Sequence, residues 1–210
     1  MKTTIKLLTV VALALAIFGQ HTTASAGGGG AFNFRGPSIL ASFSNNDPSG
    51  CIVTDVTVIA SDAMVQDAPG SGSALSFASV TISQYDNCAD LQLLLAYGSA
   101  PLTEGDISIA GNLNSATLNA TVNVFDEPSE TTFDVDISLA WIGTSALTHQ
   151  HSNSHFRSPG CIMNSRSNDA SRTAEVSGSI SDGITNFTPA PSVEASIVSV
   201  KNGTVVVGCS

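Results

Sequence analysis

The chain has 210 residues, with 17 acidic and 7 basic side chains and a formal net charge of −10. This excess of negative charge disfavours proteins that bind nucleic acid or anionic lipid surfaces, because those surfaces carry the same sign. Only 11% of the residues are charged, and the abundance of Ser, Thr, Ala, Val, Gly and Asn is typical of exported β-proteins.

The first 26 residues have the pattern of a secretory signal peptide. Two lysines precede an apolar run over residues 7–18 and a small-x-small site at 24–26, and the run is too short for a membrane anchor. We therefore expect cleavage near Ala26, a secreted or periplasmic product, and no membrane span after cleavage. The remainder, 27–210, would form a single all-β domain with a net charge of −12, because both lysines leave with the signal.

Short β-branched or alternating segments follow one another along the rest of the chain, and turn-forming residues separate them. The clearest pair covers 116–124 and 133–141, where apolar and polar side chains alternate and Pro128 interrupts the link. Asn202-Gly203 predicts a two-residue hairpin turn near the C-terminus. The other predicted strands cover residues 38–43, 51–60, 75–84, 91–97, 107–109, 171–180, 193–197 and 204–207.

This pattern predicts an all-β fold, an antiparallel β-sandwich or jelly roll of about ten strands. Four cysteines in an exported chain predict two structural disulfides, with three pairings open. We favour Cys51–Cys88 and Cys161–Cys209, because joining the nearer cysteines closes each loop at the lower entropic cost.

The polar stretch 143–170 contains His149, His151 and His155, all the histidines that remain after cleavage, and its length predicts a long loop. Two histidines separated by one residue lie on the same side of a strand, so one metal ion could bind both rings. The sequence predicts no cofactor outright, although zinc, copper or another transition metal would suit these imidazoles.

With Gly143 the spacing reads Gly-x5-His-x-His-x3-His, which is similar to the first half of the cupin motif. The resemblance covers fewer than twenty residues, and it implies a metal centre on the three histidines. His155 occupies the position of the motif's acidic ligand, and the chain after residue 26 has no histidine for a second half.

Three basic residues, Arg157, Arg166 and Arg172, lie within sixteen positions of an otherwise acidic chain. Such a cluster could hold an anionic ligand, for example a sugar acid or the carboxylates of a partner. It could equally balance acidic side chains of its own fold, and the sequence leaves both readings open.

The sequence assigns no ligand or substrate. We expect a secreted, non-enzymatic β-sandwich protein with an extracellular structural or binding role, and its partner would be an extracellular ligand or protein. The alternative is a metal-binding protein or a metal-dependent, cupin-like enzyme that uses His149, His151 and His155.

Overall fold

The computed structural model describes residues 30–68, 71–158, 161–183, 185–189 and 194–209. These residues form eleven strands that pair antiparallel within one hydrogen-bonded sheet, and none of them belongs to a helix that could cross a membrane. The predicted all-β antiparallel class is confirmed, and the arrangement fits a sandwich or jelly roll. The predicted signal peptide, residues 1–26, lies outside the described residues.

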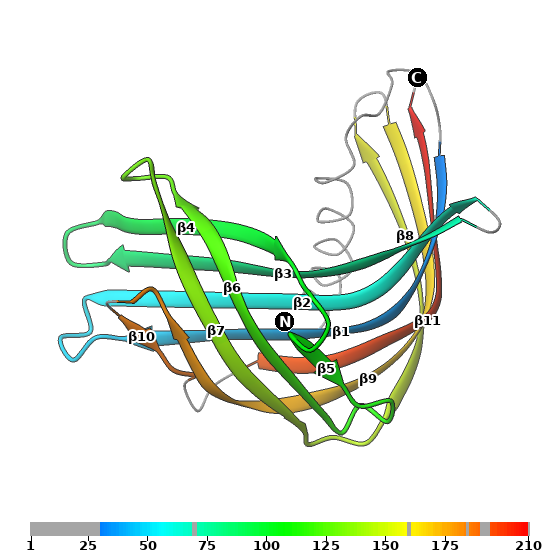
Figure 1. The fold of residues 1–210 in the computed structure, drawn as a ribbon. Helices are drawn as coiled ribbons and strands as arrows, with labels where there is room; N and C mark the ends of the chain where they lie inside the picture. The colour runs from blue at the N-terminus through cyan, green and yellow to red at the C-terminus, as the bar shows by residue number, and fades with distance from the viewer. Residues whose placement is uncertain (1–29, 69–70, 159–160, 184, 190–193, 210) are drawn as a thin grey trace.

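The strands are β1 (Gly30–Asn46), β2 (Ile52–Ala68), β3 (Ser71–Asp86), β4 (Leu91–Pro101), β5 (Ile107–Ile109), β6 (Ser115–Asp126), β7 (Thr131–Gly143), β8 (Thr148–Ser158), β9 (Cys161–Ser181), β10 (Asn186–Phe187) and β11 (Glu194–Cys209). Their order in the sheet is β9-β11-β1-β2-β3-β4-β6, and β7 pairs with both β6 and β9. The path of hydrogen-bonded neighbours that starts at β9 and runs through β11 to β6 continues to β7 and from there back to β9. The strands on this path surround one core (Figure 1).

The predicted hairpin of residues 116–124 and 133–141 is confirmed as β6 and β7, and its alternation sets the core. The even-numbered side chains of β6 and the odd-numbered ones of β7 are mostly buried, while their neighbours face outward. Trp141 is fully buried, and its indole N–H donates to the carbonyl oxygen of Leu40 at 2.9 Å. This bond joins β7 to β1, which are not neighbours in the sheet.

The β6–β7 hairpin joins the rest of the sheet at two places, and a glycine lies at each. Gly98 of β4 opposes Val124, and Gly178 of β9 opposes Leu139. A Cβ atom at either glycine would lie 2.1 Å from a carbonyl oxygen of the facing strand. Gly178 also has a φ of 120°, which side chains with a Cβ rarely tolerate. Both junctions therefore depend on the absence of a side chain.

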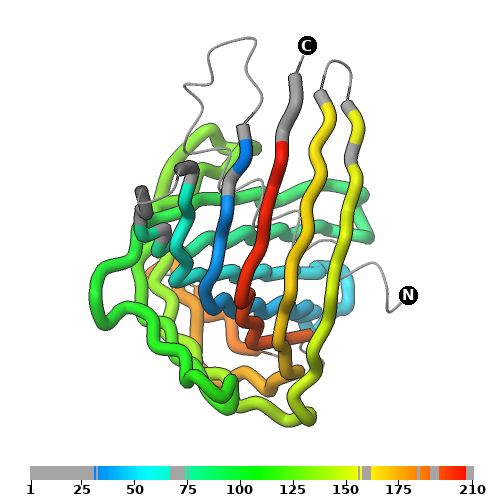
Figure 2. Tube along the Cα trace, turned by 90° about the vertical axis from the view of Figure 1, so that its right-hand side faces the viewer, coloured from blue at the N-terminus to red at the C-terminus, as the bar shows by residue number. Residues whose placement is uncertain are grey.

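β9 is 21 residues long and changes partners along its length. Residues 161–173 pair with β11 on one side, and 161–171 pair with β8 on the other. From residue 174 onward, β7 takes the place of β8. The first part of β9 thus belongs to an extension of the sheet, which projects beyond the hairpin (Figure 1). In it β1, β11, β9 and β8 lie side by side in this order (Figure 2). We define the extension as β8 with residues 161–170 of β9, 202–209 of β11 and 30–35 of β1.

The extension corrects two predictions. The predicted loop 143–170 is wrong over most of its length, because it holds β8 and half of β9. Both faces of β8 carry polar side chains, so no apolar alternation marked it as a strand. The predicted turn at Asn202-Gly203 is also wrong, because β11 continues through it with a register shift after Val200. The ring of Phe34 lies where a side chain at Gly203 would stand.

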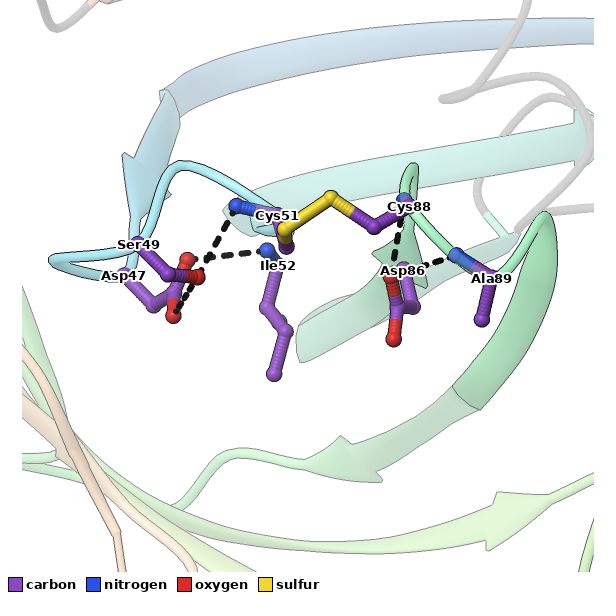
Figure 3. Close-up of a disulfide and its surroundings, with 7 residues drawn as sticks. All are labelled: Asp47, Ser49, Cys51, Ile52, Asp86, Cys88 and Ala89. Carbon is purple, nitrogen blue, oxygen red and sulfur yellow. Dashed lines mark hydrogen bonds between the residues drawn. A yellow bond between two sulfur atoms is a disulfide. The ribbon is translucent and has the colours of Figure 1, made fainter.

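The predicted Cys51–Cys88 disulfide is confirmed, and it links the β1–β2 turn to the β3–β4 turn (Figure 3). Asp86 accepts the backbone N–H groups of Cys88 and Ala89 at 2.8 and 2.9 Å. On the other side, Asp47 accepts the N–H of Ile52 at 2.9 Å. The pKa of Asp47 is lowered, chiefly by its hydrogen bond from Ser49 and then by that from Ile52. Both turns are therefore fixed by a carboxylate next to the bridge.

The pairing of Cys161 with Cys209 stays a prediction, to which the structure adds the backbone register. The two residues lie directly opposite each other in β9 and β11, and the Cα atoms of such antiparallel partners are about 4.5–5.5 Å apart, a separation that a disulfide spans. Peptide mapping of the oxidised protein without reduction should therefore recover Cys161 joined to Cys209. Recovery of Cys161 as a free thiol, or joined to another chain position, would contradict this pairing.

Substitution of Gly178 tests the junction between β7 and β9. Gly178→Ala should lower the free energy of unfolding by about 2–4 kcal/mol, because the new Cβ is strained by the positive φ and overlaps the carbonyl of Ser138. Urea denaturation measures the change. Gly111→Ala is the matched control, since a Cβ there meets nothing within 4 Å. Equal stability of the two variants would refute this account of the junction.

Candidate functional site

β8 places the three predicted metal ligands on one exposed face. His149, His151 and His155 are odd-numbered residues of an unbroken strand, and all three are exposed. Because successive side chains of a strand alternate between its faces, these three point to the same side. We call this side of the extension the outer face. Its polar and basic residues are His149, His151, Asn153, His155 and Arg157 on β8, Asn164, Arg166 and Asn168 on β9, Asn202 and Thr204 on β11, and Asn33 and Arg35 on β1.

The three histidines do not converge on one point. His149 and His155 are six positions apart on the strand, a separation of about 20 Å. Across the described part of the chain, the ring nitrogens of the three do not gather within 4.8 Å of one another. The residues present therefore do not fit the three-nitrogen centre that the cupin resemblance implies. His149 and His151 remain as a pair of neighbours on one face.

His155 has both ring nitrogens occupied. Nε2 accepts the Nε–H of Arg157 at 2.9 Å, and Nδ1 lies 2.5 Å from the side-chain oxygen of Asn164. An imidazole that accepts at Nε2 and faces an oxygen at Nδ1 carries its proton on Nδ1. This tautomer has no lone pair left for a metal ion, and instead it holds the guanidinium of Arg157 in place on the outer face.

Two of the three predicted arginines share the outer face. Arg166 of β9 opposes Asn153 of β8, between His151 and His155. Arg157 lies two residues beyond His155 on the same side. The structure therefore brings both guanidinium groups beside the histidines.

Arg172, the third predicted arginine, is not part of the outer face and hydrogen bonds to two loops. Its guanidinium donates to the carbonyl oxygens of Asn112 at 3.2 Å and of Ser145 at 2.5 Å. These bonds connect the segment before β6 to the link between β7 and β8. Arg172 is thus occupied by main-chain oxygens of its own fold, and not by the acidic side chains that one of the two readings of the sequence invoked.

Arg35 is a member of the outer face that the sequence prediction missed. Its strand neighbour Asn33 opposes Thr204, and Thr204 opposes Arg166. Arg35 is exposed and Phe34 is buried. The sequence could have predicted this alternation, because one apolar residue stands between two polar ones. The place of Arg35 on the same face as Arg166 could not be predicted, because it depends on β11 lying between β1 and β9, and its guanidinium donates to the sulfur of Met64 on β2 at 3.9 Å.

Charge is segregated between the outer face and the rest of the molecule. The outer face carries three guanidinium groups and three imidazoles, while the whole chain has 17 acidic side chains against 7 basic ones. Among the described residues of the extension, Asp169 is the single acidic one. It lies in β9 between Asn168 and Ala170 and so points to the opposite face. The outer face is therefore a local positive region over β8 and β9 on an acidic protein, and it is bounded beside Arg35 by the exposed Asp62 of β2, which points to the same side.

The opposite face of the extension is lined with hydroxyl groups. The hydroxyl oxygen of Ser152 of β8 lies 2.7 Å from that of Ser167 of β9. Ser154 and Ser165 form a second pair with the same oxygen–oxygen distance. Ser167 also donates to Oδ2 of Asp169 at 3.1 Å, while Oδ1 of Asp169 has no hydrogen-bond partner in the described part of the chain. Burial raises the pKa of Asp169, against smaller lowering effects of Ser167 and of the charge of His151.

Two further groups of polar residues are accounted for by local structure. The ligand atoms of Cys51, Asp86 and Cys88 lie within 4.8 Å of one another, but both sulfurs form the disulfide and offer no thiolate (Figure 3). A shallow pocket of about 330 Å³ beside β6 contains Asp106 and Asp136. Both carboxylates already accept hydrogen bonds, Asp106 from Thr103 and Asp136 from Thr121.

Comparisons with known proteins add little to this geometry. No family model and no curated protein matches the chain. One solved structure with partial similarity is a crystal structure described as an AttH candidate from Nitrosomonas europaea. It is 11% identical, and the match covers 84% of this chain and 52% of that one, with a TM-score of 0.33. The chain thus spans about half the length of that protein, and the similarity is too low to support a conclusion about fold or function.

Asp169 makes stability depend on pH. Because burial raises its folded pKa above the unfolded value, the ionised carboxylate destabilises the fold above that pKa, and the effect disappears as the pH falls below the unfolded value. Asp169→Asn should therefore raise the Tm at pH 7 and leave it unchanged at pH 3. Glu175→Gln, an exposed position on the same strand, controls for the loss of one negative charge. A Tm for Asp169→Asn at or below that of the parent at pH 7 would contradict the prediction.

Proposed function

We propose that the protein is exported and acts as a non-enzymatic binding protein, and that the outer face of the extension recognises an anionic ligand or the carboxylates of a partner protein. The observation that carries the proposal is the segregation of charge. Three guanidinium groups and three imidazoles lie on one face, and the one acidic residue described in the extension points the other way.

Two observations support export. The Cys51–Cys88 disulfide suits an oxidising compartment, since cytosolic thiols are kept reduced. Residues 1–26 have the charge, apolar run and cleavage pattern of a secretory signal. Together they favour action outside the cytoplasm, where a protein of this kind meets extracellular or periplasmic ligands.

The surroundings of the arginines support binding of anions. Arg157 is held by His155, so less side-chain freedom is lost when it meets an anion. Asparagine side chains at 153, 164 and 168 lie around Arg166 on the same face, and their amide groups donate hydrogen bonds to carboxylate oxygens. Because the face is exposed, each charged contact should be weak and sensitive to salt.

Metal binding is the second candidate function, and the observation that favours it is the pair His149 and His151. They are two residues apart on one exposed face of β8, so zinc or copper would find two imidazole ligands there. Two ligands do not complete a protein site for these metals, and further donors would have to come from water or from a partner.

Binding of an acidic polymer tests the proposal. The protein should bind oligogalacturonate, a carboxylate polymer without a peptide backbone, and the affinity should fall steeply between 50 and 300 mM salt as screening increases. Arg157→Gln/Arg166→Gln should weaken binding by about tenfold, because two exposed ion pairs are removed. Calorimetric titration measures both effects.

The matched control changes the net charge by the same amount at a distance from the outer face. Thr117→Glu/Thr132→Glu adds two negative charges at exposed positions of β6 and β7 and should leave the affinity nearly unchanged. Equal weakening by both double variants would show that net charge alone matters. That result, or binding that ignores salt, would overturn the proposal.

A further inference from the structure

We propose that the open edge of β8 accepts an extended acidic segment of a partner protein as an additional strand. The added strand would hydrogen bond to the main chain of β8, and its alternate carboxylates would lie on the outer face. The inference rests on the proposed function and specifies the kind of anionic partner, namely an extended polypeptide.

β8 has one unpaired side along its whole length. All eleven of its residues pair with β9, and no other described strand pairs with β8. In an antiparallel pair, alternate residues direct their N–H and C=O groups away from the partner. The free side of β8 therefore presents a row of main-chain donors and acceptors that a further strand can pair with.

Apart from the charge of Arg157, the β8 edge lacks the features with which proteins usually block strand addition. Protected edges are short, or they carry charged side chains (especially lysine), proline, a bulge or an inward-pointing charge. The edge strands β5 and β10 are short, with three and two residues. β8 has eleven residues with no lysine and no proline, and its register with β9 has no shift. The side chains of Thr148, Gln150, Ser152 and Ser154, which face the hydroxyl-lined side, are uncharged.

The charge of the outer face identifies the occupant. A strand added next to β8 places every second side chain beside His149, His151, His155 and Arg157. Acidic side chains there would pair with the opposite charge of Arg157 and accept hydrogen bonds from the ring N–H groups of His149 and His151. A second copy of the chain would instead bring the arginines and histidines of two β8 strands together. Such a dimer would also bring together two proteins that each carry a net charge of −10 and therefore repel each other. An acidic segment therefore fits this edge better than a second copy.

The hydroxyl-lined side adds a second requirement on the partner. Gln150, Ser152 and Ser154 would flank the other set of side chains of the added strand, and Asp169 lies on that side of β9. Small polar residues such as threonine fit there, and carboxylates on that side would be repelled by Asp169, which lies on β9, about 10 Å from the added strand. The expected partner segment thus alternates acidic and small polar residues over about ten positions.

The test uses the whole protein and four synthetic peptides of eleven residues, capped at both ends. The first alternates Thr and Glu, and the second alternates Thr and Gln. The third and fourth are the Thr/Glu peptide with N-methyl groups on all the Glu amides or on all the Thr amides. Only one set of amides faces β8 in a paired strand, so each methylated peptide is the matched control for the other.

We expect the Thr/Glu peptide to bind at least tenfold more tightly than the Thr/Gln peptide. We also expect one of the two methylated peptides to bind at least tenfold more weakly than the unmethylated Thr/Glu peptide, and the other to bind as tightly as that peptide. If both methylated peptides bind like the parent while oligogalacturonate also binds, strand addition is overturned and the anion-binding function stands. If oligogalacturonate does not bind, the proposed function itself fails. A stable dimer of the protein alone that ignores the Thr/Glu peptide would show that a second copy occupies the edge, and would also overturn the inference.

Discussion

The change of partner along β9 is the constraint on which the rest of the structure depends. Up to residue 173 this strand lies between β11 and β8, and from residue 174 it pairs with β7 instead. The second half of β9 therefore closes the sheet around the core that β6 and β7 line with apolar side chains, while the first half continues beyond it. A glycine at position 178 permits the close approach of β7 that this arrangement requires.

The extension is built differently from the core. It packs buried apolar side chains such as Phe34 and Val205 on one side of β1 and β11, and at the same level on β8 and β9 it relies on main-chain pairing and serine pairs. Neutral hydrogen bonds contribute only about 0.5–1.5 kcal/mol each, so an extension of this kind is held chiefly by its continuity with β9, β11 and β1. That construction leaves both faces and one edge of β8 available, which is the basis of the proposed binding role.

The sequence predicted the parts of the fold that have one buried face. The β6–β7 hairpin, the all-β class and the Cys51–Cys88 bridge could be read from alternation and cysteine spacing. β8 could not, because Thr148 to Ser158 is polar on both sides, so no apolar alternation marks it as a strand even though its partner, the first half of β9, follows it directly in the chain. The Asn202-Gly203 turn was misread because the same dipeptide also suits a strand irregularity, and Phe34, which covers Gly203, is far away in the chain.

The candidate site could be predicted only in part. The sequence pointed to the histidines, Arg157 and Arg166, and the structure brings these residues together on the outer face; their role in binding stays a prediction. Arg35 and the separate role of Arg172 depend on contacts between strands remote in sequence, and spacing along the chain carries no information on those.

The central claim is that residues 148–158 form an ordered edge strand with one open side, and amide hydrogen exchange resolved by residue tests it most directly. The account predicts alternating protection along β8, with slow exchange at amides that face β9 and fast exchange at those between them. Uniformly fast exchange would show that this segment is a loop. Uniformly slow exchange would show that the free side of β8 is already covered, and either result would contradict the account.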